Sequence, residues 1–232
     1  MKVIATTILG ASAALMLSAT LAAAAERRPP YVLELFTSQG CNSCPPANAN
    51  LIRLRDRPDV LALSFAVTYW DGLGWKDIFG KPEFTRRQEV YEGPLGHPGP
   101  FTPQMVVNGG RDAVGADISE IEPLLAGQRL GEAPLVNLSA SSINVGPGAA
   151  PQGGADVWLV RYDPRIVEVP VTRGENAGHT LPHANVVREF VRLGRWDGNQ
   201  TAYPLSPGDT GLKAAVLLQA PDGGRILSAV TD

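Results

Sequence analysis

The stretch Tyr31-Val-Leu-Glu-Leu-Phe-Thr-Ser-Gln-Gly-Cys-Asn-Ser-Cys-Pro-Pro46 decides the fold of this chain. Its first seven residues form a nearly continuous apolar run, which is typical of a strand buried on both faces. Pro45 and Pro46 favour a helix that begins with them, because proline is tolerated in the first helical turn. Residues 60–67 are a second apolar run. This order of strand, helix and strand predicts a βαβ unit with two parallel strands.

The two cysteines of the chain, Cys41 and Cys44, lie between the first predicted strand and the helix. In open α/β sheets, ligands bind at this place, outside the carboxyl ends of the parallel strands. A disulfide that closes so short a loop restricts the unfolded chain very little. A zinc site needs about four protein ligands, and the chain has no second cysteine pair. The spacing therefore favours a redox-active dithiol, with a local structural disulfide and a metal site as the alternatives.

Residues 1–25 predict a secretory signal peptide. Lys2 precedes an uncharged apolar stretch over residues 3–21, and four alanines follow before Glu26. Small residues after a short apolar segment are typical of a cleavage site. We therefore expect a periplasmic or secreted protein that keeps no membrane span after signal removal, in a compartment where disulfides persist. The formal net charge of −3 and the lack of a basic run argue against a nucleic-acid partner.

The remaining part of the first half, up to residue 130, predicts two helices and a hairpin. Residues 83–91 have a helical pattern. Asn108 and Gly109 form a tight-turn signal between predicted strands at 105–107 and 112–116. A capping box then starts a helix that runs to about residue 129.

Residues 131–232 predict a separate β-rich domain, built as an antiparallel sheet or a sandwich. Short runs with alternating apolar residues are separated by clusters of glycine and proline. The expected strands are residues 135–140, 156–161, 166–171, 186–193, 212–219 and 226–230. Two roles are open for this domain, namely shaping a substrate site and binding a partner.

Three motifs carry a resemblance to a known family. They are Glu34-Leu-Phe-Thr-Ser-Gln-Gly-Cys-x-x-Cys-Pro-Pro46, Tyr69-Trp-Asp-x-Leu-Gly-Trp-x-Asp77 and Thr102-Pro-Gln-Met-Val-Val-Asn-Gly109. Together they resemble a bacterial secreted family, the domain of unknown function 1223, and residues 174–188 also look like that family. The order of the elements resembles the thioredoxin fold. The resemblance thus implies an α/β thioredoxin-like fold over residues 26–130.

The resemblance also implies roles for individual residues. In the thioredoxin fold a cis-proline faces the disulfide and the peptide beside it pairs with the substrate backbone, which places Pro103 and Thr102 at the site. Cys41 is the expected nucleophile, because a helix N-terminus lowers the pKa of a thiol, and Cys44 is the expected resolving thiol. Glu34 lies roughly where thioredoxins keep a buried acid. It is either a general base for Cys44, or an acid that caps a helix or pairs with an arginine.

Two further features bear on the site. Pro45 and Pro46 have no N–H groups, so a helix that begins there gives Cys41 less stabilisation than usual. Three aromatic residues after the second strand, Tyr69, Trp70 and Trp75, are expected either to line a substrate groove or to pack a lid.

These observations predict an extracytoplasmic thiol-disulfide oxidoreductase that acts on protein thiols or disulfides without a cofactor or a bound metal. A membrane redox protein is one candidate partner. The alternative is a thioredoxin-like binding module or a copper carrier, for which the two cysteines and His97 would be the metal ligands. Oxidants, reductants and isomerases share the motif, so the direction of the reaction stays open.

Overall fold

The computed structural model describes residues 29–127, 130 and 133–232. The predicted signal peptide, residues 1–25, lies outside the described residues. No helix within these described ranges is both long enough and apolar enough to cross a membrane.

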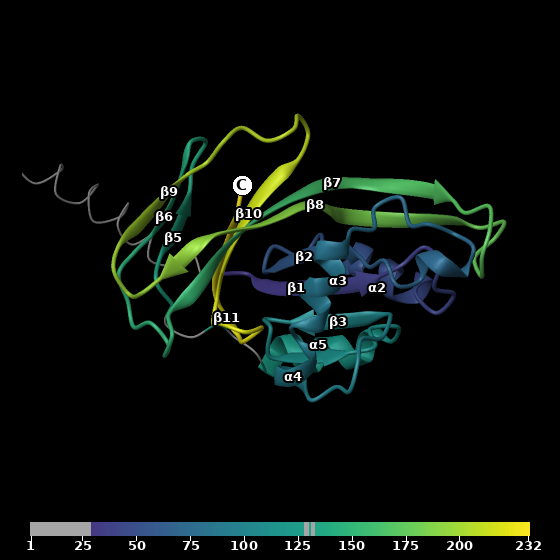
Figure 1. The fold of residues 1–232 in the computed structure, drawn as a ribbon, viewed down its shortest axis with the longest axis horizontal. Helices are drawn as coiled ribbons and strands as arrows, with labels where there is room; N and C mark the ends of the chain where they lie inside the picture. The colour runs from purple at the N-terminus through teal and green to yellow at the C-terminus, as the bar shows by residue number, and fades with distance from the viewer. Residues whose placement is uncertain (1–28, 128–129, 131–132) are drawn as a thin grey trace, which may run out of the picture.

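A mixed sheet of eight strands forms the centre of a β-rich molecule with few helices (Figure 1). The strand order is β11-β10-β7-β8-β2-β1-β3-β4. Strands β1 (Tyr31–Thr37) and β2 (Val60–Ala66) pair in parallel, as the apolar runs predict. Strand β3 (Gln104–Val107) then pairs antiparallel with β1, and β4 (Arg111–Ala113) pairs with β3. Because β1 lies inside the sheet, every one of its residues is buried.

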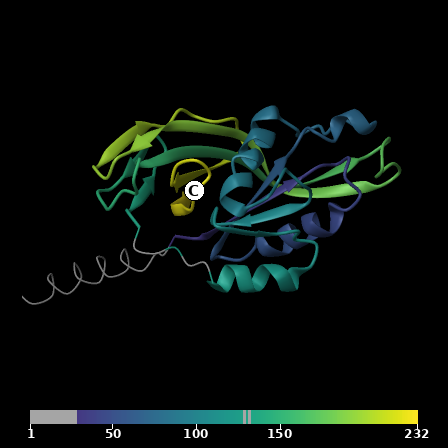
Figure 2. The same ribbon diagram turned by 60° about the horizontal axis from the view of Figure 1, so that its bottom comes forward.

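Helices cover both faces of this part of the sheet (Figure 2). Leu33 and Leu35 of β1 pack on one face against α2 (Pro45–Leu54) and α5 (Ile118–Gly127). The alternate residues of β1 point to the opposite face, where they pack with α3 (Pro82–Glu89). The helix expected over 83–91 is α3, which ends two residues earlier, and the short α4 (Glu92–Leu95) follows it. The 3-10 turn η1 (Asp71–Leu73) precedes both helices.

The turn between β3 and β4 has the predicted geometry. Asn108 and Gly109 have φ angles of 49° and 63°. Gly109 is also closely approached, because a Cβ atom there would lie 2.6 Å from the carbonyl oxygen of Gly224. The backbone at this turn therefore requires glycine for both its conformation and its packing.

The second half of the chain extends the same sheet. Strands β7 (Ala155–Pro170) and β8 (Thr180–Trp196) form a long antiparallel hairpin, and β8 lies parallel to β2. The strands expected at 156–161 and 166–171 are thus parts of one strand, whose register shifts between Asp163 and Ile166. Pro164 lies at this irregularity and has no N–H group for the ladder. The predicted boundary near residue 130 therefore does not separate two sheets.

Five remaining strands complete this half. Strands β10 (Lys213–Gln219) and β11 (Ile226–Thr231) continue the large sheet at its far edge. A separate sheet of three short strands has the order β5-β6-β9. Its strands are β5 (Val136–Leu138), β6 (Ser142–Val145) and β9 (Thr201–Pro204). Its apolar residues share a buried cluster with β7, β10 and Trp196, so the two sheets pack together as in a sandwich.

Candidate functional site

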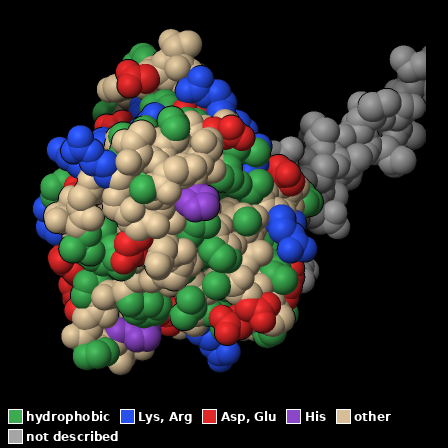
Figure 3. Space-filling model, turned by 90° about the vertical axis from the view of Figure 1, so that its right-hand side faces the viewer, with side chains coloured by type: hydrophobic (Ala, Val, Ile, Leu, Met, Phe, Trp, Pro, Cys, Tyr) green, Lys and Arg blue, Asp and Glu red, His purple; other side chains and the backbone are tan. Residues whose placement is uncertain are grey.

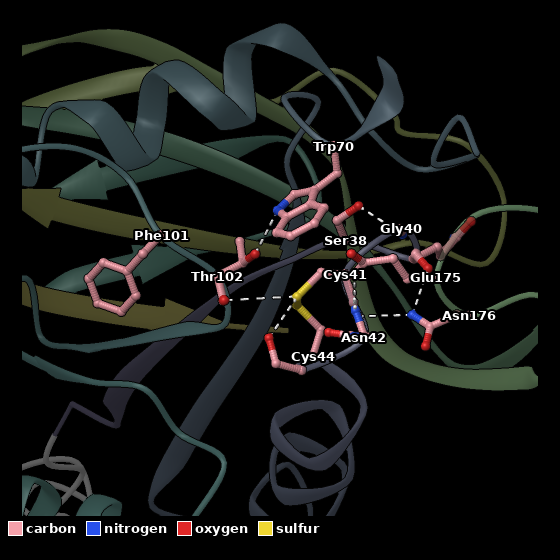
Figure 4. The surroundings of a disulfide bond; sticks show 12 residues. Ser38, Gly40, Cys41, Asn42, Cys44, Trp70, Phe101, Thr102, Glu175 and Asn176 are labelled. Carbon is pink, nitrogen blue, oxygen red and sulfur yellow. Dashed lines mark hydrogen bonds between the residues drawn. A yellow bond between two sulfur atoms is a disulfide. The ribbon is translucent and has the colours of Figure 1, made fainter. Parts of the chain in front are cut away.

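Cys41 and Cys44 form a disulfide at the N-terminus of α2, with their Cα atoms 5.5 Å apart (Figure 4). The turn between them is closed by the backbone, because Cys44 N–H donates to the carbonyl oxygen of Cys41. Helix α2 begins at Pro45, with Cys44 as its N-cap. Both cysteines are fully buried, with no exposed surface.

The segment before β3 lies directly against this disulfide. The carbonyl oxygen of Thr102 is 3.8 Å from Cys41 Sγ, and the Thr102–Pro103 peptide bond is cis. The indole N–H of Trp70 donates to Thr102 Oγ1 over 2.8 Å. Figure 4 shows Trp70 and Thr102 side by side next to the sulfur atoms. The structure therefore brings together the predicted site residues Cys41, Cys44, Thr102, Pro103 and Trp70.

The tip of the β7–β8 hairpin, residues 171–179, contacts the other side of the CxxC turn. Asn176 is buried, and its Nδ2 donates to the carbonyl oxygens of Gln39 and Cys41, each over 2.9 Å. Glu175 Oε2 accepts a hydrogen bond of 3.2 Å from Asn42 N–H. The site thus contains residues from both halves of the chain.

Sequence reasoning missed Glu175 and Asn176 as site residues. Residues 174–178 resemble the family, but that resemblance implies no role for Glu175 or Asn176. Their contacts with the cysteine turn span more than 130 positions of sequence. Strand periodicity cannot predict contacts of this kind.

The other two predicted aromatic residues hold the segment between β2 and α3. The Trp75 indole N–H donates to Gln39 Oε1 over 2.9 Å, and Tyr69 OH donates to Gln88 Oε1 over 3.2 Å. Trp75 also packs against a small buried cluster around Phe79. Contacts within the protein thus hold both side chains, which agrees with the packing interpretation of this aromatic segment.

Buried Asp77 fixes the start of the cysteine turn. One carboxylate oxygen accepts from Gln39 N–H and the other from Phe79 N–H, each over 2.8 Å. Burial raises the pKa of Asp77 from 3.8 to about 6, despite these hydrogen bonds.

Glu34 pairs with an arginine, which is the second of the two roles predicted for it. Its carboxylate accepts two hydrogen bonds of 3.0 Å from the Arg87 guanidinium and a further one from Tyr91 OH. Glu34 alternates along β1 with Leu33 and Leu35, so it faces α3 and not α2, whose N-terminus carries the disulfide. Since Arg87 and Tyr91 occupy its oxygens, the geometry supports a structural role and not a general base for Cys44.

The three histidines lie apart from the disulfide contacts. His97 Nε2 is 2.7 Å from Asp112 Oδ2, and the ring packs edge-on against Phe101. His183 is buried against Phe79, and burial lowers its pKa to about 4. His179 is exposed, in the tip of the β7–β8 hairpin. Within the described ranges, no three His, Cys, Asp or Glu residues gather as a metal site.

The end of the molecule that carries the hairpin tip is partly apolar. Figure 3 looks onto this end and shows hydrophobic side chains across its surface, with acidic groups among them. In the segment between β2 and α3, Tyr69, Leu73 and Ile78 are exposed.

Fold and site together define a class: a β-rich protein on an eight-stranded mixed sheet, with a buried CxxC disulfide at the start of a helix. The chain belongs to the family described as "Protein of unknown function (DUF1223)", which matches residues 32–219. No curated protein sequence matches the chain.

Two solved structures are similar to this one. The crystal structure of protein AGR_C_4864 from Agrobacterium tumefaciens has a TM-score of 0.73 and 32% sequence identity, covering 89% of this chain and 95% of that one. The structure named HBP35 of Porphyromonas gingivalis has a TM-score of 0.54 and 18% identity, covering 88% of this chain and 75% of that one. At this lower identity the second likeness concerns the fold alone.

Proposed function

We propose that this protein is an extracytoplasmic thiol-disulfide oxidoreductase that acts on protein cysteines, with a thioredoxin-like arrangement around its CxxC motif. The order β1, α2, β2, α3, β3, β4 and α5 supports the thioredoxin-like arrangement. The extracytoplasmic location rests on the predicted signal peptide.

One observation carries this proposal. The two cysteines of the chain are bonded to each other across a separation of three, next to the backbone carbonyl of Thr102. A loop this short adds little stability through the unfolded chain. A strand end beside the sulfur atoms offers backbone groups to which an extended substrate can bind. Redox exchange accounts for both features, whereas a stabilising role accounts for neither.

The exchange itself needs only the two cysteines and a substrate pair. In the reduced protein, the Cys41 thiolate attacks one sulfur of a substrate disulfide, and the other substrate sulfur leaves as a thiolate and takes up a proton. The Cys44 thiol then loses its proton and attacks Cys41 Sγ, which breaks the mixed disulfide and releases the second substrate thiol. The substrate gains two electrons and two protons, and the protein becomes the disulfide. The reverse sequence oxidises a substrate dithiol.

Burial of the disulfide sets a condition for this chemistry. Because both cysteines are fully covered, a partner sulfur reaches Cys41 only when a covering group moves. Trp70 and Thr102 cover one side, and they are joined to each other by a side-chain hydrogen bond. Substrate binding on this side must therefore displace Trp70 or open that bond.

The same burial favours a second candidate function. In a thioredoxin-like binding module the covered disulfide would be a structural element only, and the exposed apolar side chains near it would contact a partner. This candidate predicts no exchange with partner thiols.

A trapping experiment separates the two candidates. Cys44→Ser leaves Cys41 without its resolving thiol, so an exchange catalyst accumulates mixed disulfides with partner proteins in the periplasm. These complexes disappear on reduction and in the matched Cys41→Ser variant. If Cys44→Ser forms no more mixed disulfides than Cys41→Ser, the oxidoreductase proposal is wrong.

A further inference from the structure

We propose that Glu175 and Asn176, at the tip of the β7–β8 hairpin, are positioning residues of the redox site, and that the Glu175 carboxylate makes the cysteine pair a reductant of protein disulfides. The direction of transfer rests on the proposed function. The effect of the hairpin tip on Cys41 does not.

Asn176 ties the hairpin tip to the cysteine turn. Its single amide group donates to the carbonyl oxygens on both sides of Gly40, those of Gln39 and Cys41. The side chain is 5% exposed, so both hydrogen bonds are sheltered from water. These bonds fix the backbone from which the Cys41 side chain projects.

Glu175 brings a negative charge to the same turn. Its carboxylate accepts a hydrogen bond from the N–H of Asn42, the residue that directly follows Cys41. In the reduced protein, backbone N–H groups near a helix N-terminus would stabilise a Cys41 thiolate. This N–H instead binds a carboxylate, and that carboxylate repels a thiolate formed beside it.

The surroundings offer little compensation for this repulsion. At the start of α2, Pro45 and Pro46 have no N–H groups, and the first turn carries no charged side chain. From the β2–α3 segment, Asp77 binds the backbone of Gln39 and adds a second acidic group. Arg173, in the hairpin tip, is exposed. Before β3, the neighbour of Cys41 is the uncharged Thr102, which presents a carbonyl oxygen.

This arrangement disfavours the thiolate and thereby favours the disulfide. A pair that prefers its disulfide state gives up electrons readily, which is the property of a reductant. Its substrate class is then protein disulfides. The oxidised pair must be regenerated by a dithiol reductant, which passes two electrons and two protons to Cys41 and Cys44 by the same exchange.

The first test measures the reactivity of Cys41 alone. In the Cys44→Ser background, residues 26–232 are alkylated with iodoacetamide between pH 6 and pH 10, and the rate is followed by mass. Glu175→Gln keeps a hydrogen-bond acceptor but removes the charge. Because Glu175 is exposed and solvent partly screens its charge, the substitution should raise the rate at pH 7 about threefold and move the pH profile to lower pH. Glu168→Gln, an equal charge change at an exposed position of β7, is the matched control and should change neither.

Asn176→Ala tests the positioning role separately. Loss of its two hydrogen bonds frees the turn, so alkylation should accelerate at every pH while the midpoint of the profile stays in place. The inference is overturned if Glu175→Gln leaves the profile where it is, or if Glu168→Gln moves it equally.

The direction is tested with both cysteines present. Glu175→Gln should make the pair more oxidising than the parent protein in buffers of graded thiol-disulfide potential. An unchanged potential refutes the direction. If the alkylation profile shifts but the intact pair never exchanges reversibly, the effect of the hairpin tip on Cys41 stands, whereas its assignment as a reductant and the proposed function both fail.

Discussion

Replacing Arg87 by leucine should destabilise the protein strongly, because it leaves a carboxylate buried without its cation. The side chains of Arg87 and Glu34 are 2% and 0% exposed, and the guanidinium makes two hydrogen bonds to that carboxylate. Breaking a buried pair by removing one partner typically costs about 3–5 kcal/mol. For a chain of this length this corresponds to a fall in Tm of roughly 6–20 °C.

Urea unfolding of the oxidised protein at pH 7 measures this loss. Arg57→Leu is the matched control, since Arg57 pairs with Asp59 and Glu122, whose side chains are 49% and 53% exposed, and its loss should stay below about 1 kcal/mol. The double variant Arg87→Leu with Glu34→Leu removes both charges and should be more stable than Arg87→Leu alone. A loss below about 1 kcal/mol for Arg87→Leu, or a less stable double variant, would refute the interpretation of Glu34 as one half of a buried pair.

Three further predictions concern the surroundings of the site. The pKa of Asp77 is raised from 3.8 to about 6, so between these two pH values the folded protein holds a proton that the unfolded chain has lost. The stability that this group contributes is therefore present below about pH 4 and is lost as pH rises to about 6. Asp77→Asn should remove that contribution from the pH dependence of urea unfolding. The pKa of His183 is lowered from 6.5 to about 4, so its contribution is present above pH 6.5 and is lost as pH falls toward 4. His183→Phe should therefore lose less stability than the parent protein over that range. Thr102→Val removes the acceptor of the Trp70 indole, so dithiothreitol should reduce the disulfide several-fold faster, as followed by alkylation and mass.

The central part of the fold follows from local patterns in the sequence. The apolar runs of β1 and β2, the proline start of α2 and the turn at Asn108 and Gly109 all appear in the structure as predicted. Each depends on neighbouring residues alone, on burial, on proline chemistry or on positive φ. Features of this kind can be recognised without knowledge of the rest of the chain.

The joining of the two halves could not be predicted in the same way. The parallel pairing of β8 with β2 links Ser64 to Val186, and no local pattern specifies a partner that far away. The short strands β6 and β9 have only four residues each, too few for a clear alternation. The large sheet is continuous across the boundary near residue 130 that the change in composition predicts.

The candidate site shows the same division between local and distant contacts. The spacing of Cys41 and Cys44 is sufficient to predict that the two cysteines act together as a pair. The environment of that pair depends on Asn176 and Glu175, which the long β7–β8 hairpin carries to it from the other half of the chain. Glu34 was ambiguous for a related reason, since its partner Arg87 lies on a different element and no spacing in the sequence relates the two.

The reduction potential of the Cys41–Cys44 pair tests the central claim most directly. Residues 26–232 are equilibrated in thiol buffers of graded potential, trapped with an alkylating reagent, and the modified cysteines are counted by mass. A redox catalyst that acts as a reductant should show a reversible two-electron transition toward the lower end of the range from about −270 to −120 mV. A pair that stays oxidised below about −300 mV would contradict the account and make the disulfide a structural element of a binding module.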